Sequence, residues 1–131
     1  MTVKVVDASA VVALLFNELT REAIVDRLRG ASLHAPVLLG FETANACLKK
    51  MRKAPGERQA LLDAFSLLDE LAISPEAIDL AEAIALAERA NLSVYDASYL
   101  WLAHALDAEL VTLDEKLARA YEKQRRSRRP S

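Results

Sequence analysis

Short apolar runs alternate with longer helical patterns along this chain. Residues 3–6 are three valines and a lysine, a run too short and too β-branched to start a helix, and it leads directly into Asp7. Residues 10–16 are apolar on almost every side, which is typical of a buried helix. A buried strand followed by a buried helix predicts an α/β fold with a parallel sheet, in which ligands bind beyond the carboxyl ends of the strands.

The same alternation continues to residue 121. Hydrophobic spacing predicts further helices between Thr20 and Gly30 and at residues 37–52, 57–71, 76–90, 94–106 and 114–121. Short strands are predicted at residues 33–35, 72–74 and 109–113, and prolines close the first two. Ser93 is expected to open the helix at 94–106. The repeated order of strand and helix supports one α/β domain.

Composition limits the class of protein. With 131 residues the chain is long enough for one domain, and a hydrophobic fraction of 53% excludes disorder for most of it. The single cysteine, Cys47, lies in an apolar helical pattern and is expected to be a reduced core thiol, as in a cytoplasmic protein. No segment approaches the roughly 18–20 apolar residues that span a bilayer, and no signal peptide is indicated, so no membrane association is expected.

Charge is unevenly distributed along the chain. Residues 123–131 contain five basic residues and no acid, and we expect them to form a mobile tail after a single domain at residues 1–122. That domain carries 12 basic and 19 acidic residues, a net charge of −7. An acidic body does not bind nucleic acid by charge alone, so an RNA substrate would require cations.

Three aspartates share one local context. Asp7, Asp96 and Asp114 each lie at the start of a predicted helix, and Asp7 and Asp114 directly follow predicted strands. The structural alternative for each is helix N-capping, which an aspartate performs for about 0.5–2 kcal/mol.

Glu42 lies in a stretch that shows no solvated face until Lys49. A carboxylate in such surroundings is costly unless it is paired or bound to a cation, and no basic residue lies within one helical turn of it. Asn45, three residues later, shares its face. The alternative is a glutamate at the helix rim that reaches water.

Asp7, Glu42, Asp96 and Asp114 come from four separate elements that a parallel sheet can bring to one edge. Two carboxylates about 4 Å apart repel by roughly 4 kcal/mol at an effective dielectric constant near 20, so such a cluster takes up protons or binds a hard cation. Oxygen ligands of this kind suit Mg²⁺ or Mn²⁺ rather than zinc. An ion held in this way is suited to phosphodiester hydrolysis.

The residues around these acids resemble the PIN-domain family, in particular the VapC-type toxin ribonucleases. The resemblance extends from Val3 to about Leu117, in order and with the family's spacing. The matching segments are Val-Val-Asp7-Ala-Ser9, Glu42-Thr-Ala-Asn45-Ala, Tyr95-Asp96-Ala-Ser-Tyr99-Leu and Leu110-Val-Thr112-Leu-Asp114-Glu-Lys-Leu117. Each segment alone is weakly specific, and the four in order are specific.

The resemblance implies a small three-layer α/β/α sandwich with a mainly parallel sheet, and a Mg²⁺- or Mn²⁺-dependent endoribonuclease. It implies that the four acids hold the metal, that Ser9 and Thr112 support the cluster, and that Asn45 is a neighbouring partner. It also implies a cognate antitoxin protein, which covers the acidic site from a groove between helices, and a homodimer.

Other features have weaker interpretations. Lys116, one turn into the last predicted helix, is a candidate phosphate contact. The arginines of the tail and the basic residues of 49–53 could also bind RNA, although solvated ends explain them at least as well. Gly40, inside a predicted helix, is best explained by a close helix crossing.

Two rival functions compete with the nuclease. One is a receiver-like or phosphatase-like domain in which Asp7 is phosphorylated, but such folds usually place a second acid close in sequence, and Ala8 and Ser9 follow here. The other is a catalytically inert PIN-like module that binds RNA or a protein partner.

Overall fold

A computed structural model describes residues 2–127 and contains one four-stranded parallel sheet with the strand order β3-β2-β1-β4. The strands are β1 (Thr2–Val6), β2 (Ala31–Pro36), β3 (Ser74–Glu76) and β4 (Glu109–Val111). All three neighbouring pairs are parallel, which confirms the predicted sheet.

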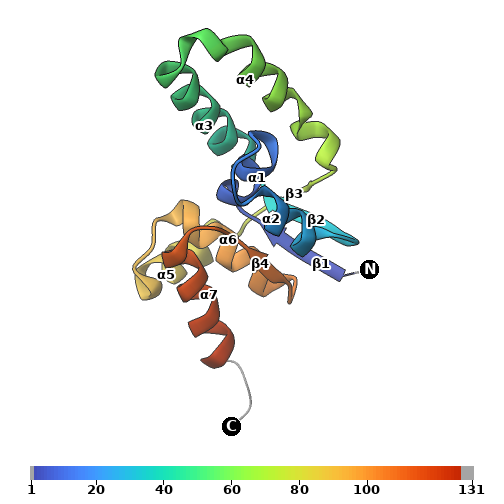
Figure 1. Cartoon of the computed structure of the whole chain (residues 1–131). Helices are drawn as coiled ribbons and strands as arrows, with labels where there is room; N and C mark the ends of the chain where they lie inside the picture. The colour runs from blue at the N-terminus through green and yellow to red at the C-terminus, as the bar shows by residue number, and fades with distance from the viewer. Residues whose placement is uncertain (1, 128–131) are drawn as a thin grey trace.

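Helices cover both faces of the sheet (Figure 1). They are α1 (Ala8–Leu15), α2 (Arg21–Leu28), α3 (Leu39–Lys53), α4 (Arg58–Phe65), α5 (Leu80–Ala90), α6 (Val94–Ala105) and α7 (Glu115–Ser127), with 3₁₀ turns η1 (Pro55–Glu57) and η2 (Ser66–Leu71). Helices α3 and α4 lie above the sheet in Figure 1, and α5 and α7 lie below it. The fold is therefore the expected α/β/α arrangement.

The core is aliphatic, as the low aromatic content predicts. Val5, Val11, Leu100 and Leu117 are fully or almost fully buried and belong to one continuous cluster. Tyr99 is the largest buried side chain among the described residues, with 1% of its surface exposed. Burial of this kind contributes roughly 1.5–3 kcal/mol for each large apolar side chain.

The register of β1 and β4 positions the functional edge. Val6 is paired with Val111, and the backbone N–H of Asp7 donates to the carbonyl of Val111 at 3.3 Å. Both strands therefore end at the same edge of the sheet, and the residues that follow them meet there.

One of the two prolines expected to close strands does so. Pro36 is the last residue of β2, whereas Pro75 is the middle residue of β3. β3 is an edge strand, where a missing backbone N–H is tolerated. Its last residue, Glu76, contacts Nδ1 of His34 at 2.8 Å. Helix α5 begins only at Leu80 instead of at residue 76, because its N-cap is Asp79, whose carboxylate accepts from the N–H of Glu82 at 3.1 Å.

The predicted helix at 57–71 is divided in two. The hydroxyl of Ser66 donates to the carbonyl of Asp63 at 2.6 Å, and from Ser66 onward the chain continues as the 3₁₀ turn η2. Such a bond competes with the regular helical ladder. Ala72, in the left-handed region with φ of 53°, ends the turn.

The last helix is longer than expected. α7 continues past Tyr121 to Ser127, so the first five residues of the predicted mobile tail are helical. Residues 128–131 lie outside the described part of the chain, and the rest of that prediction falls on them.

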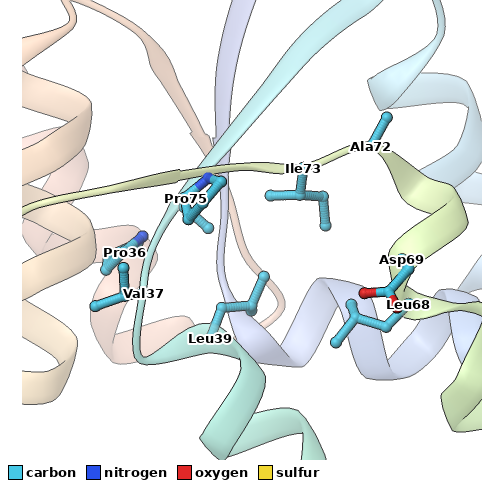
Figure 2. A pocket seen from close by; sticks show the side chains of 9 residues that line it. Pro36, Val37, Leu39, Leu68, Asp69, Ala72, Ile73 and Pro75 are labelled. Carbon is cyan, nitrogen blue, oxygen red and sulfur yellow. The ribbon is translucent and has the colours of Figure 1, made fainter.

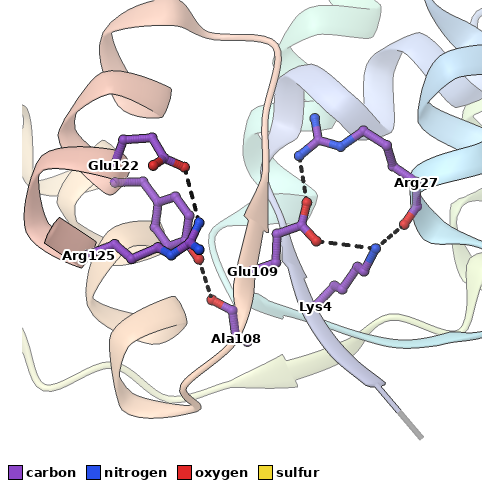
Figure 3. Close-up of polar contacts among 7 residues, drawn as sticks. Lys4, Arg27, Ala108, Glu109, Glu122 and Arg125 are labelled. Atoms are coloured by element: carbon purple, nitrogen blue, oxygen red, sulfur yellow. Dashed lines mark hydrogen bonds and ion pairs between the residues drawn. The ribbon is translucent and has the colours of Figure 1, made fainter. Parts of the chain in front are cut away.

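A cluster of charged side chains joins the amino-terminal end of the sheet to α2 (Figure 3). Glu109 contacts Lys4 at 3.3 Å and Arg27 at 2.8 Å, and Lys4 also donates to the carbonyl of Arg27. Burial alone would raise the pKa of Glu109, but its hydrogen bonds to Arg27 and Lys4 outweigh that effect and lower it.

Three smaller expectations have clear outcomes. Cys47 is a buried free thiol among the described residues. A Cβ added to Gly40 would meet nothing within 4 Å, so the close helix crossing expected there is wrong. No helix of residues 2–127 is both long and apolar enough to cross a bilayer.

Candidate functional site

Asp7 stands at the carboxyl end of β1 with both carboxylate oxygens engaged. Oδ1 accepts from the hydroxyl of Ser9 at 2.7 Å and from the N–H of Ala10 at 3.2 Å. Oδ2 accepts from the hydroxyl of Thr112 at 2.7 Å. The bond from Ala10 makes Asp7 the N-cap of α1, so the capping role considered for it is present alongside any other role.

Burial dominates the electrostatics of Asp7. Only 5% of the residue is exposed, and this desolvation raises the pKa of its carboxyl above the ordinary value. The hydrogen bonds from Thr112, Ser9 and Ala10 act in the opposite direction, and the negative charge of Asp114 raises the pKa further. No basic side chain of residues 2–127 forms an ion pair with Asp7.

Thr112 and Ser9 link Asp7 to the loop after β4. The hydroxyls of Ser9 and Thr112 lie 3.3 Å apart. Ser9 accepts from the N–H of Leu113 at 2.8 Å, and Thr112 accepts from the N–H of Asp114 at 3.0 Å. The hydroxyls of Ser9 and Thr112 therefore contact both Asp7 and the segment that carries Asp114.

Glu42, in the first turn of α3, is held by a residue to which no role had been assigned. The phenol of Tyr99 on α6 donates to Oε1 of Glu42 at 2.6 Å. Burial raises the pKa of Glu42, the Tyr99 bond lowers it, and the charges of Asp96 and Asp7 raise it. Glu42 is half-buried, so its side chain is neither fully solvated at the helix rim nor fully enclosed in the core.

The sequence contained a signal for Tyr99. It follows Asp96 by three residues in the predicted helix at 94–106, so the two side chains share one face. Its contact with Glu42 joins residues 57 positions apart, which no local pattern indicates. Burial and the charge of Glu42 raise the pKa of Tyr99 far above its usual range, so the phenol remains a donor.

Asp96 does not cap its helix. The N-cap of α6 is Ser93, whose hydroxyl accepts from the N–H of Asp96 at 3.0 Å. The Asp96 carboxylate is therefore free of that role. Burial and the charge of Asp114 raise its pKa, whereas the nearby ammonium of Lys116 lowers it.

Asp114 caps α7. Its Oδ1 accepts from the N–H of Leu117 at 2.9 Å, and the residue is exposed. The capping interpretation therefore holds for Asp7 and Asp114 and is wrong for Asp96. Asn45 is exposed and makes no side-chain hydrogen bond to Glu42 within residues 2–127.

The four acids share one electrostatic neighbourhood. The charge of Asp7 acts on Glu42, that of Asp96 on Glu42, and that of Asp114 on both Asp7 and Asp96. In residues 2–127, however, no three His, Cys, Asp or Glu side chains are close enough as they stand to hold a metal ion. The donor set fits a hard divalent cation in chemistry, since it consists of carboxylates that no basic residue pairs with.

The pocket in Figure 2 lies elsewhere. It has a volume of about 190 Å³ at the ends of β2 and β3, and Pro36, Leu39, Leu68 and Ile73 are among its lining residues. Asp69 supplies its only charged side chain. This pocket is apolar and does not include the acids, so it is not the candidate active site.

Comparison with known proteins agrees with this geometry. The PIN domain family model matches residues 4–123. The chain is 37% identical over 117 residues to the VapC ribonuclease Mb0985 of Mycobacterium bovis, covering 87% of each chain. It is 35% identical over 119 residues to ribonuclease VapC3 of Mycobacterium tuberculosis, covering 89% of this chain and 86% of the relative.

A solved structure shows the same fold. The crystal structure of PAE2754 from Pyrobaculum aerophilum matches with a TM-score of 0.74 over 94% of this chain and 92% of that chain, at 24% identity. Together with the sequence matches, this likeness leaves the receiver-like alternative without support. The chain belongs to the PIN-domain family, and its relatives within that family are VapC ribonucleases.

Proposed function

We propose that this protein is a Mg²⁺- or Mn²⁺-dependent endoribonuclease that acts as the toxin of a toxin–antitoxin pair. The observation that carries the proposal is that Asp7, Glu42, Asp96 and Asp114, from four elements, influence one another's pKa values through their charges and form no ion pair among the described residues. The ribonuclease names of the relatives agree with this chemistry.

Asp7 and Asp96 are the proposed principal metal ligands, and Glu42 and Asp114 complete the site or act on its outer side. A bound divalent ion of this type polarises a phosphodiester and acidifies water. Ser9 and Thr112 fix the orientation of Asp7, and Tyr99 fixes that of Glu42. Attack by water in line with the leaving O3′ forms one P–O bond and breaks another, giving a 5′-phosphate and a 3′-hydroxyl.

Cleavage of RNA by the wild type and by Asp7→Asn tests this function. With Mg²⁺ or Mn²⁺ present we expect the wild type to cleave and the variant to be slower by about a hundredfold or more, since a metal ligand supplies several kcal/mol. Asp69→Asn, an exposed aspartate on η2, is the matched control and should cleave like the wild type. Equal cleavage by Asp7→Asn and the wild type would remove Asp7 from the chemistry. No cleavage by any of them would favour the inert binding module.

An antitoxin protein is the proposed inhibitor. We propose that a helix of this partner docks in a mainly apolar groove of about 410 Å³ between α1, α2 and η2, whose lining residues include Leu14, Val25, Leu33 and Leu71. The groove includes none of the four acids, so covering of the acidic site would fall to another part of the partner. The product of a neighbouring short reading frame should co-purify with this protein and suppress cleavage, and its failure to do either would contradict this assignment.

Association of two copies is also proposed. Helices α3 and α5 expose large apolar side chains, with Phe41 83%, Leu80 64% and Ile84 59% accessible. Ile84→Glu should convert a dimer to a monomer in size-exclusion chromatography with light scattering. Leu19→Glu, at a fully exposed apolar position before α2, should leave the dimer intact. A wild-type monomer would contradict this proposal.

A further inference from the structure

Helix α7 carries a stripe of exposed basic side chains. Lys116, Arg119, Lys123 and Arg126 follow the spacing i, i+3, i+7 and i+10, which places them on one face of a helix. All four are exposed, and we call them the basic stripe. Leu117, Ala120 and Tyr121, on the other side of α7, pack against the core, so the stripe faces solvent.

The basic stripe begins at the acidic site. Lys116 is close enough to Asp96 for its charge to lower the pKa of that carboxyl, and it follows the cap residue Asp114 by two positions. From Lys116 to Arg126 the helix rises about 15 Å. The stripe therefore leads from the four carboxylates along α7 toward the C-terminal end, where the helix extends below the rest of the molecule in Figure 1.

These cations are largely available to a ligand. Among residues 2–127, Lys116, Lys123 and Arg126 form no ion pair, and Arg119 contacts Glu115 only at 4.0 Å. Arg119, Lys123 and Arg126 also line an open hollow of about 520 Å³ along α7, together with Ala118 and one acid, Glu122. Glu122 is paired with Arg125 at 3.6 Å, which reduces its repulsion of an anion.

We propose that the basic stripe of α7 binds the phosphate backbone of the RNA strand and leads it to the acidic site. This inference rests on the proposed ribonuclease function, because it explains how a protein with a net negative charge can bind RNA, which is also negatively charged. Residues 1–122 carry a net charge of −7, which repels RNA, and the stripe supplies cations beside the carboxylates. Contacts to phosphates carry no base information, so the stripe determines affinity and strand path rather than sequence preference.

Binding of RNA by the full-length protein tests the stripe. The probe is an unstructured, fluorescein-labelled RNA of about 20 nucleotides, measured by anisotropy in EDTA between about 50 and 200 mM KCl. The triple variant Arg119→Gln/Lys123→Gln/Arg126→Gln should bind about tenfold more weakly or worse. The slope of log Kd against log[KCl] should fall by about 2, since each single-strand phosphate contact contributes about 0.7.

A matched variant separates the stripe from net charge. Lys49→Gln/Arg52→Gln/Lys53→Gln removes three exposed cations from the far end of α3, remote from α7 in Figure 1. It should change Kd by less than about threefold. Arg119→Lys/Arg126→Lys keeps the charge and should bind like the wild type, and Glu122→Gln should bind more tightly. Glutamine has nearly the helix propensity of lysine and arginine, and circular dichroism checks that α7 remains folded.

The outcomes distinguish this inference from the proposed function. Equal weakening by both triple variants, or no weakening by the stripe variant, would overturn the stripe even if the protein cleaves RNA with Mg²⁺. Stripe-dependent binding without any cleavage would support the stripe and remove the ribonuclease. Stripe-dependent binding of polyglutamate but not of RNA would overturn the RNA assignment in favour of an acidic protein partner.

Discussion

Asp7 shows how one side chain meets several requirements. It caps α1, accepts from Ser9 and Thr112, and is close enough to Asp114 and Glu42 for their charges to interact. The hydroxyl donors satisfy its oxygens, but burial still raises the pKa of its carboxyl. Burial raises the free energy of the ionised Asp7 carboxylate, and a bound cation would lower it.

Tyr99→Phe tests the contact between α6 and α3. The substitution removes the donor to Glu42 with almost no change in volume, so the pKa of Glu42 should rise further because the remaining effects, burial and the charges of Asp96 and Asp7, all raise it. An NMR titration of the Glu42 carboxyl should show this, and unfolding should become easier by about 1 kcal/mol. An unchanged titration would show that the bond does not persist in solution.

Thr43→Val should stabilise the protein. Thr43 is fully buried, and its hydroxyl is the one buried side-chain oxygen or nitrogen of residues 2–127 without a hydrogen-bond partner. Valine has nearly the same shape and removes this unsatisfied group, so the free energy of unfolding should rise by about 1 kcal/mol in urea denaturation. Thr43→Ser, which keeps the hydroxyl and loses the methyl group, should be less stable than the wild type. A less stable Thr43→Val would indicate a partner for the hydroxyl.

Which residues could be predicted from the sequence depended on local context. Asp7, Ser9, Thr112 and Asp114 follow the ends of paired strands, and the structure brings them together because β1 and β4 are neighbours. Tyr99 received no role because its partner Glu42 is remote in the chain. Asn45 shares a helix with Glu42, but its exposed position shows that a shared face does not ensure contact.

At the scale of elements, the interiors of helices were easier to predict than their ends. Helix α6 occupies nearly its expected range because Ser93 caps it and Asn91, with φ of 55°, ends the helix before it. Pro75 misled the prediction, since it lies within β3, whereas Pro36 ends β2 as expected. Helix α7 was underestimated because its last turns are strongly charged and lack an apolar stripe, although Lys and Arg are good helix formers.

Two substitutions at the start of α6 separate capping from metal binding. Ser93→Ala removes the N-cap and should cost about 1 kcal/mol of stability in EDTA. Asp96→Asn should leave metal-free stability unchanged or raised, because it removes repulsion from Asp114. Mn²⁺ at a hundredfold excess over its Kd should stabilise the wild type and Ser93→Ala by about 2.7 kcal/mol, and Asp96→Asn not at all. An Asp96→Asn protein that Mn²⁺ stabilises like the wild type would exclude Asp96 as a ligand.

At the scale of the whole molecule, charge divides the surface. Asp7, Glu42, Asp96 and Asp114 act on one another's charge around the start of α7, and the basic stripe runs along that helix away from them. The separation of acidic and basic groups could not be predicted from the net charge, because 17 basic and 19 acidic residues almost cancel to −2. It arises from the topology, which places the loop after β4, and hence the start of α7, beside the end of β1.

Metal-free stability should depend on pH through these acids. Burial raises the pKa of Asp7, Glu42 and Asp96, so the folded chain holds their protons more tightly than the unfolded chain does. Stability contributed by the protonated groups is therefore lost as pH rises through the folded-state pKa values. In EDTA, the stability of Asp7→Asn relative to the wild type should rise as pH increases above about 4, measured by urea denaturation. A difference that does not vary with pH would contradict this linkage.

The ion pair of Lys4 with Glu109 bears on the fidelity of folding. These residues face each other in the β1–β4 pairing, at the opposite end of the strands from Asp7. Sliding β1 by one residue would turn its side chains to the other face and leave Lys4 beside Leu110. The Lys4–Glu109 ion pair thus disfavours a shifted register of β1. The register that keeps this pair is the same one that places Asp7 beside the end of β4.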